Sequence, residues 1–317
     1  MISALKKTLL TAVAIGTLSG CSTLMESREV TADRIARPAF MMERQIPAGD
    51  FNLIAWERVR KEGQPANIYI EGDGLAWLSP QQASLDPTPQ NPVALNLAAM
   101  DKSPNVIYLA RPCQFSGDRI WRNAKPKWNG DGACPSKYWT DARFAPEVID
   151  SMSLALDEIK QRYKISEFNL IGYSGGATVA ALLAADREDV KSFRTVAGNL
   201  NHTAFTTLHG VTPMEASLNA VDRAADLRFI PQHHYVGGED QVVPPQVFSS
   251  YEQALSPSQC VAYTLVPDAG HEYGWVDKWP ELMKKPLGCS DRPQPVDPSQ
   301  FTPPPQEFID AGKGKVF

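Results

Sequence analysis

The fold is decided by residues 168–185, which read FNLIGYSGGATVAALLAA. The first four residues form a short apolar run of the kind found in a buried strand. A Gly-Tyr-Ser-Gly-Gly sequence follows at once and places Ser174 among glycines. From Ala177 onward the residues are small and mostly apolar, which favours a tightly packed helix. The segment therefore predicts a strand, a sharp turn that carries Ser174, and a helix.

A G-x-S-x-G pattern alone carries little information, but a strand before it and a helix after it mark a nucleophile. The backbone of such a turn is strained, and glycine neighbours avoid clashes with the strand and the helix. The helix N-terminus also directs free N–H groups and its positive dipole end at a developing oxyanion. We therefore predict that Ser174 is a nucleophile. The alternative is a plain strand-to-helix turn in a nucleotide-binding sheet.

A serine hydroxyl needs a base to take its proton, and the base needs an acid to orient it. In this arrangement the chain order is serine, acid, histidine. Asp240 lies in a glycine-containing turn just after a predicted strand and before Pro244, so we predict that it is the acid. Glu239 is the competing candidate. For either residue, the alternative is an acid in a surface turn.

His271 is the predicted base, because it follows the last predicted strand, residues 262–266, in a Gly-His pair. The chain has five histidines. The others precede the acid, which is the wrong order: His202, His209, His233 and His234. The two neighbours in that set, at 233 and 234, fall within a predicted strand.

The oxyanion hole is expected to combine the N–H of Gly175 with one from the loop Ile70-Glu71-Gly72-Asp73-Gly74. Within that loop Asp73 is the first choice of donor and Gly74 the second. A plain turn or a metal site are the alternatives for this loop. Nothing else in the sequence completes a metal site, so none is predicted.

Strands alternate with helices along residues 51–288, which predicts one α/β domain built on a parallel sheet. Two long segments interrupt the pattern, a loop at 111–145 and a cap-like insertion at 198–228, and both are expected to roof a pocket. Their aromatic residues are equally consistent with packing. The expected strands are residues 51–56, 67–71, 106–110, 168–171, 193–197, 229–236 and 262–266. The expected helices are residues 91–100, 147–163, 177–185, 247–255 and 275–284.

Taken together, Glu71–Gly74, Gly172–Gly176, Asp240 and His271 resemble the α/β-hydrolase superfamily over residues 50–285. Within that superfamily the chain looks most like exported hydrolases of proteobacteria. The resemblance implies a mostly parallel sheet of about eight strands with helices on both faces. It also implies a Ser-His-Asp acyl-enzyme mechanism that needs no cofactor. Glu71 departs from the His-Gly pattern common at this point, which leaves the second oxyanion donor open.

The N-terminus has the pattern of an exported lipoprotein. Lys6 and Lys7 precede a short apolar stretch, and Leu-Ser-Gly before Cys21 resembles a lipobox. Residues 1–20 are then a signal peptide, Cys21 is acylated, and residues 21–50 are a tether. Ser22 after the cysteine favours the outer membrane, facing the periplasm. An ordinary cleaved signal with a chance cysteine is the alternative.

Four further cysteines form an even set, which in an exported protein indicates two disulfides with three possible pairings. We favour Cys113–Cys134 and Cys260–Cys289, because each pair is close in sequence; buried free thiols are the alternative. After residue 289 the chain becomes proline-rich, and residues 289–317 are predicted to be an extended tail. The net charge of −5 and the lack of a basic run argue against a nucleic-acid partner.

Carboxylic ester hydrolysis is the predicted reaction, on a small-molecule or acyl substrate. A peptidase or an acyltransferase would use the same three residues. A non-enzymatic envelope lipoprotein that binds through this fold is the remaining hypothesis. The substrate, its chain length and the oligomeric state are left open by the sequence.

Overall fold

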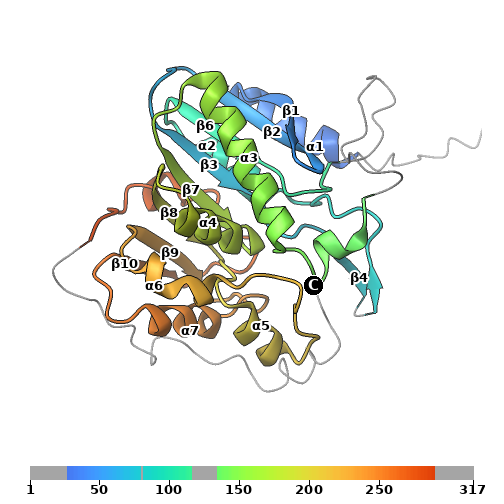
Figure 1. The fold of residues 1–317 in the computed structure, drawn as a ribbon, viewed down its shortest axis with the longest axis vertical. Coiled ribbons are helices and arrows are strands. Elements are labelled where there is room, and N and C mark those ends of the chain that lie inside the picture. The colour runs from blue at the N-terminus through green and yellow to red at the C-terminus, as the bar shows by residue number, and fades with distance from the viewer. Residues whose placement is uncertain (1–26, 80, 116–133, 290–317) are drawn as a thin grey trace, which may run out of the picture.

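The computed structural model describes residues 27–79, 81–115 and 134–289. Its centre is an eight-stranded sheet in the order β1-β2-β6-β3-β7-β8-β9-β10 (Figure 1). The strands are β1 (Met42–Ala48), β2 (Phe51–Val59), β3 (Ala66–Ile70), β6 (Asn105–Leu109), β7 (Phe168–Tyr173), β8 (Val190–Val196), β9 (Gln232–Gly237) and β10 (Val261–Val266). A separate two-stranded sheet contains β4 (Trp77–Ser79) and β5 (Gln82–Ala83).

Only β2 runs against its neighbours, pairing antiparallel with β1 and with β6, and the remaining pairs in the large sheet are parallel. The prediction of a mostly parallel sheet of about eight strands is therefore confirmed. Side chains of a strand alternate between the two faces, as in β3, where Ile68 and Ile70 join one core and Tyr69 joins the other. Burial on both faces explains why a central strand such as β6 is largely apolar and fully buried.

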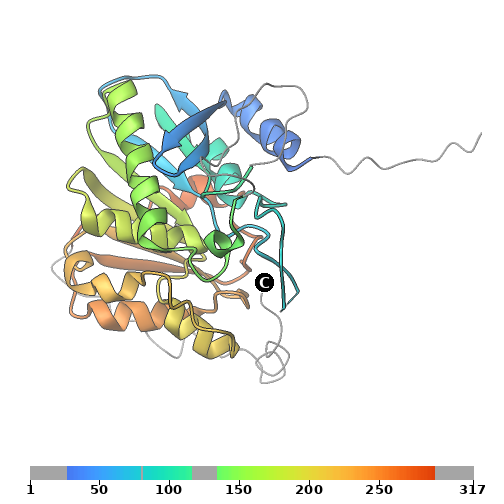
Figure 2. The same ribbon diagram turned by 45° about the vertical axis from the view of Figure 1, so that its right-hand side comes forward.

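Helices cover both faces of the sheet, as predicted. Buried residues of α3, α4 and α7 belong to one core cluster, and those of α1, α2 and α8 to the other. Figure 2 shows α3 lying along one face of the sheet. The α-helices are α1 (Arg28–Ala36), α2 (Val93–Met100), α3 (Pro146–Tyr163), α4 (Gly175–Asp186), α5 (His202–His209), α6 (Ala224–Leu227), α7 (Pro245–Leu255) and α8 (Trp279–Leu282). Within the described residues there are also short 3₁₀ helices: η1 (Arg37–Ala39), η2 (Ser136–Trp139) and η3 (Ala220–Arg223).

The structure corrects the prediction that residues 21–50 are a tether. Residues 28–48 are folded, and they contain α1, η1 and the edge strand β1. The polar appearance of β1 has a physical reason: an edge strand is exposed on one side, and its pairing with β2 comes from backbone groups that composition does not reveal. The signal peptide, Cys21 and residues 290–317 lie outside the described residues.

Two further elements differ from the predictions. The helix expected at 275–284 contains only the four residues of α8, and β9 begins at Gln232 rather than at residue 229. The insertion at 198–228 contains α5, η3 and α6. Of the loop at 111–145, residues 116–133 lie outside the described part, and η2 lies within the rest. None of the helices in the described ranges is long and apolar enough to cross a membrane.

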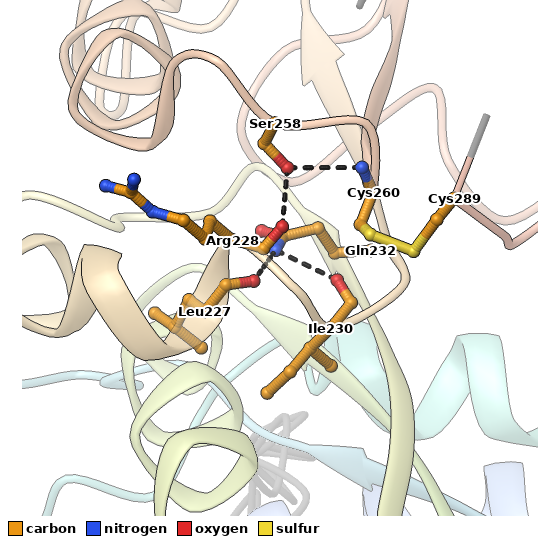
Figure 3. Close-up of a disulfide and its surroundings, with 7 residues drawn as sticks. All are labelled: Leu227, Arg228, Ile230, Gln232, Ser258, Cys260 and Cys289. Carbon is orange, nitrogen blue, oxygen red and sulfur yellow. Dashed lines mark hydrogen bonds between the residues drawn. A yellow bond between two sulfur atoms is a disulfide. The ribbon is translucent and has the colours of Figure 1, made fainter. Parts of the chain in front are cut away.

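Both favoured disulfide pairings, Cys113–Cys134 and Cys260–Cys289, are present. Figure 3 shows the second, which joins the start of β10 to the last described residue. Beside it the hydroxyl of Ser258 accepts a hydrogen bond from the Cys260 N–H and donates one to the Arg228 carbonyl (Figure 3). The disulfide therefore ties the described C-terminal end of the chain to the start of the edge strand β10.

Candidate active site

Four loops meet at one edge of the sheet, because the carboxyl ends of parallel strands lie on the same side. Ser174 directly follows β7, and the loop 71–74 directly follows β3. Asp240 comes shortly after β9, and His271 comes shortly after β10. The topology thus assembles residues that are far apart in the chain.

Ser174 lies in the strained turn that the sequence predicts, with φ of 51° and ψ of −121°. A positive φ is unfavourable for a residue with a side chain, and it is held here by the strand and the helix on either side. The glycines around it are required by close packing. A Cβ on Gly172 would lie 2.4 Å from the Gly176 carbonyl oxygen, and one on Gly176 would lie 2.3 Å from the Ile70 carbonyl oxygen.

The structure brings the side chains of Ser174, His271 and Asp240 together in one hydrogen-bonded chain. Nε2 of His271 lies 3.0 Å from the Ser174 Oγ. Nδ1 of the same ring lies 2.9 Å from Oδ2 of Asp240 and 3.2 Å from Oδ1. With the Nδ1 proton donated to the carboxylate, Nε2 is free to accept the proton of the serine hydroxyl.

Asp240, and not Glu239, contacts the histidine. Its side chain is fully buried, and Oδ1 accepts hydrogen bonds from the backbone N–H groups of Val242 and Val243 at 2.9 and 2.8 Å. Glu239 is exposed and accepts a hydrogen bond from the Tyr273 hydroxyl instead. The fixed carboxylate orients the imidazole, because two backbone donors hold it in place.

Two aromatic residues that the sequence analysis did not assign to the site hold the backbone of His271. The Tyr173 hydroxyl donates to the His271 carbonyl at 3.1 Å, and its ring packs against the imidazole at 5.3 Å. Trp275 Nε1 donates to the same carbonyl at 3.0 Å and to that of Gly270 at 2.8 Å. Tyr173 occupies the variable position next to the nucleophile in the pattern, so only the folded chain reveals its role.

The predicted oxyanion residues lie against the nucleophile turn. Gly175 is the first residue of α4, so its N–H has no partner within the helix. The loop 72–74 packs onto this turn, since a Cβ on Gly175 would lie 2.1 Å from Oδ1 of Asp73. A Cβ on Gly72 would lie 3.1 Å from the Ser174 Cβ. Asp73 and Gly74 both line the cavity in front of the serine.

Glu71 is buried beneath this loop, with 1% of its surface exposed. Its Oε1 accepts the N–H of Gly72 at 2.9 Å, and its Oε2 accepts the Tyr108 hydroxyl at 3.1 Å. Burial raises the pKa of this carboxyl from 4.5 to about 7, against the stabilising effect of its hydrogen bonds. Glu71 therefore ties the oxyanion loop to β6.

Two arginines from the loop at 111–145 hold Asp73. Nη1 of Arg111 lies 3.2 Å from Oδ1, and Nη1 of Arg143 lies 2.6 Å from Oδ2. Burial opposes the ionisation of Asp73, but the two guanidinium groups outweigh it and lower the pKa below its usual value. Neither arginine was singled out from the sequence, because they lie about 40 and 70 residues from Asp73 without a recognisable pattern.

A cavity of about 460 Å³ opens onto Ser174 and His271. Its wall contains both polar and apolar groups. From the insertion at 198–228, Phe205 lines the cavity, whereas Met214 is buried in the core. Asn199 and Phe205 are the described residues of the insertion that line the cavity. Among the described residues, no group of three or more His, Cys, Asp or Glu side chains is arranged to hold a metal ion.

The fold is shared with solved structures of low sequence identity. An esterase of Pyrococcus furiosus matches with a TM-score of 0.52 at 15% identity, over 78% of this chain and 91% of that one. Est1E from Butyrivibrio proteoclasticus matches with a TM-score of 0.50 at 12% identity, over 76% and 97%. No family model matches the chain, and no curated protein matches it in sequence. With its sheet order, its helices on both faces and these structural matches, the chain has the α/β-hydrolase fold.

Proposed function

We propose that the protein is a serine hydrolase that cleaves carboxylic esters through an acyl-enzyme. The observation that carries the proposal is the chain of contacts from Ser174 through His271 to Asp240, at 3.0 and 2.9 Å. This arrangement provides a nucleophile, a base at hydrogen-bonding distance and an acid that orients the base. The protein of Pyrococcus furiosus that shares the fold is described as an esterase, which supports the proposal.

The steps follow from the geometry. Nε2 of His271 takes the hydroxyl proton as the Ser174 Oγ attacks the ester carbonyl, and Asp240 stabilises the imidazolium that forms. The N–H of Gly175 and one from the loop at 73–74 bind the negative oxygen of the tetrahedral intermediate. The imidazolium then gives its proton to the departing alcohol, and an acyl-serine remains. Water, deprotonated by the same histidine, attacks the acyl-serine and releases the acid.

The test is a substrate panel with wild-type protein and Ser174→Ala. p-Nitrophenyl esters of increasing chain length report ester cleavage, and aminoacyl p-nitroanilides report amide cleavage. We expect ester turnover that is lost in Ser174→Ala, with kcat/KM for amides far lower than for esters. If kcat/KM for the amides equalled that for the esters, the proposed activity would be that of a peptidase and not of an esterase. A folded wild-type protein that cleaves neither class would favour a binding protein.

We further propose that the domain is held at a membrane of the cell envelope through acylated Cys21, facing the periplasm. Six residues separate this cysteine from the first residue of α1 at Arg28. At about 3.5 Å per residue, they hold the domain within roughly 20 Å of the lipid anchor. Metabolic labelling with an alkyne palmitate analogue tests this. The label is expected on the wild-type protein and lost in Cys21→Ser, and labelling of both would contradict the assignment.

A further inference from the structure

The ion cluster on Asp73 has more positive than negative charge. One carboxylate contacts the guanidinium groups of both Arg111 and Arg143. The arginine side chains are 4% and 7% exposed, so water screens them poorly. A charge in such surroundings is costly unless it has a partner of opposite sign. The cluster therefore has one cationic charge that Asp73 does not neutralise.

That charge is directed into the cavity by Arg143. Nε of Arg143 donates to the Thr140 carbonyl at 2.6 Å, and Nη1 donates to Asp73. Among the described residues Nη2 of Arg143 has no hydrogen-bond partner. It is also absent from the set of fully buried polar atoms that lack a partner, so it is accessible to solvent. Since Arg143 lines the cavity that contains Ser174, Nη2 supplies two N–H donors to whatever occupies that space.

Arg111 has the complementary role. Its Nη2 donates to the backbone carbonyl of Arg143, and its guanidinium packs over the Phe144 ring at 5.1 Å. It does not line the cavity. Arg111 thus supports the segment that carries Arg143, and only Arg143 is placed to meet a ligand.

Four carboxyl groups line the cavity beside Arg143, and of these only Asp73 forms an ion pair with it; the others are Glu71, Glu239 and Glu272. Glu71 is buried beneath the loop and accepts hydrogen bonds there, with a pKa of about 7. Glu239 and Glu272 are exposed and come from the loops that carry the acid and the base, where water and salt screen them. Arg143 is the only Lys or Arg side chain among the described residues that line the cavity, so a negatively charged ligand group has this one cationic partner there.

We infer that Arg143 forms an anion-binding subsite and that the substrate is a small ester carrying a carboxylate. A planar guanidinium matches a carboxylate in geometry, and a hydrogen bond between two charged groups is roughly twice as strong as a neutral one. The inference rests on the proposed ester hydrolysis at Ser174, and it adds the class of substrate. A cavity of about 460 Å³ with mixed polar walls suits such a molecule better than a long alkyl chain.

The test uses two pairs of esters, each with a charged member and a neutral amide of the same shape. Monomethyl succinate and methyl 4-amino-4-oxobutanoate place the group on the acyl side. 4-Acetoxybenzoate and 4-acetoxybenzamide place it on the leaving-group side. In at least one pair we expect the wild type to prefer the charged ester at least tenfold in kcat/KM. Arg143→Gln should reduce that ratio at least tenfold, and Arg143→Lys should retain more of it.

Arg223→Gln is the matched control, because Arg223 pairs with Asp186 and Asp226 at the surface and does not line the cavity. It should keep the wild-type ratio. The subsite would be overturned if the wild type showed no preference for the charged ester in either pair. It would also be overturned if Arg143→Gln left the ratio of kcat/KM values unchanged, or lowered kcat/KM equally for both members of a pair. If Arg143→Gln does not fold, Arg143→Lys takes its place: its kcat/KM ratio of charged to neutral ester should lie below that of the wild type, and an unchanged ratio would overturn the subsite. An uncharged fluorophosphonate separates the two proposals: failure to label folded wild type refutes the hydrolase, whereas labelling without charge preference refutes the subsite alone.

Discussion

Replacing Glu71 by glutamine removes a buried carboxyl whose pKa is raised to about 7. Between pH 4.5 and about pH 7, the folded protein keeps a proton on the Glu71 carboxyl, whereas the unfolded chain releases it. The contribution of Glu71 to stability is therefore fully present below pH 4.5 and is lost as the pH rises through 7. The difference between a pKa of about 7 and one of 4.5, at about 1.4 kcal/mol for each pH unit, amounts to at most about 3.5 kcal/mol.

Urea unfolding of wild type and Glu71→Gln at pH 5 and pH 8 measures this directly. The free energy of unfolding of the wild type should fall relative to that of Glu71→Gln by up to about 3 kcal/mol over this range. Other titrating groups cancel in the comparison, because both proteins contain them. Glu188→Gln, which removes an exposed carboxyl, is the control and should follow the wild type. Parallel pH profiles for wild type and Glu71→Gln would refute the assignment of a buried, proton-binding Glu71.

Three further variants test the site and the fold. Asp240→Asn should lower kcat for a p-nitrophenyl ester by about 10³ to 10⁴, because the imidazole loses its orienting carboxylate. Gly176→Ala should lower the free energy of unfolding in urea by 1 kcal/mol or more, on the order of known overpacking costs, whereas Gly288→Ala should not, since no atom lies within 4 Å of a Cβ there. Replacing Cys260 and Cys289 together by serine should cost about 3.6 kcal/mol in the same assay, by the loop-entropy estimate for 29 residues.

Each of these variants also has a result that would count against the account. If Asp240→Asn retained ester turnover and Glu239→Gln lost it, Glu239 and not Asp240 would be the acid that orients His271. A Gly176→Ala protein as stable as the wild type would mean that the strand β3 does not pack as closely on α4 as described. Unchanged urea unfolding of the double cysteine variant would mean that the disulfide constrains little of the chain.

The sequence alone predicts the nucleophile turn and the order of acid and base, because these depend on local patterns. At Gly172 and Gly176 a Cβ atom would clash with neighbouring backbone atoms. The sequence shows this requirement directly, because glycine is the residue without a Cβ. In the structure Asp240 contacts His271, whereas Glu239 accepts a hydrogen bond from Tyr273.

What the sequence does not reveal depends on pairing between distant segments. The edge strand β1 is polar, and its place in the sheet comes from backbone hydrogen bonds to β2. Arg143 lies 70 residues from Asp73, and no spacing rule connects them. Tyr173 stands at a position that the G-x-S-x-G pattern leaves unspecified, although its hydroxyl holds the backbone of His271. Contacts of this kind become visible only when the chain is folded.

The central claim is that Ser174 is an activated nucleophile. A fluorophosphonate probe that reacts with activated serines, followed by digestion and mass spectrometry, tests it without knowledge of the substrate. We predict a single modified peptide that contains Ser174, with labelling lost in Ser174→Ala and strongly slowed in His271→Ala. A folded protein that is not modified, or equal modification of wild type and Ser174→Ala, would contradict the account.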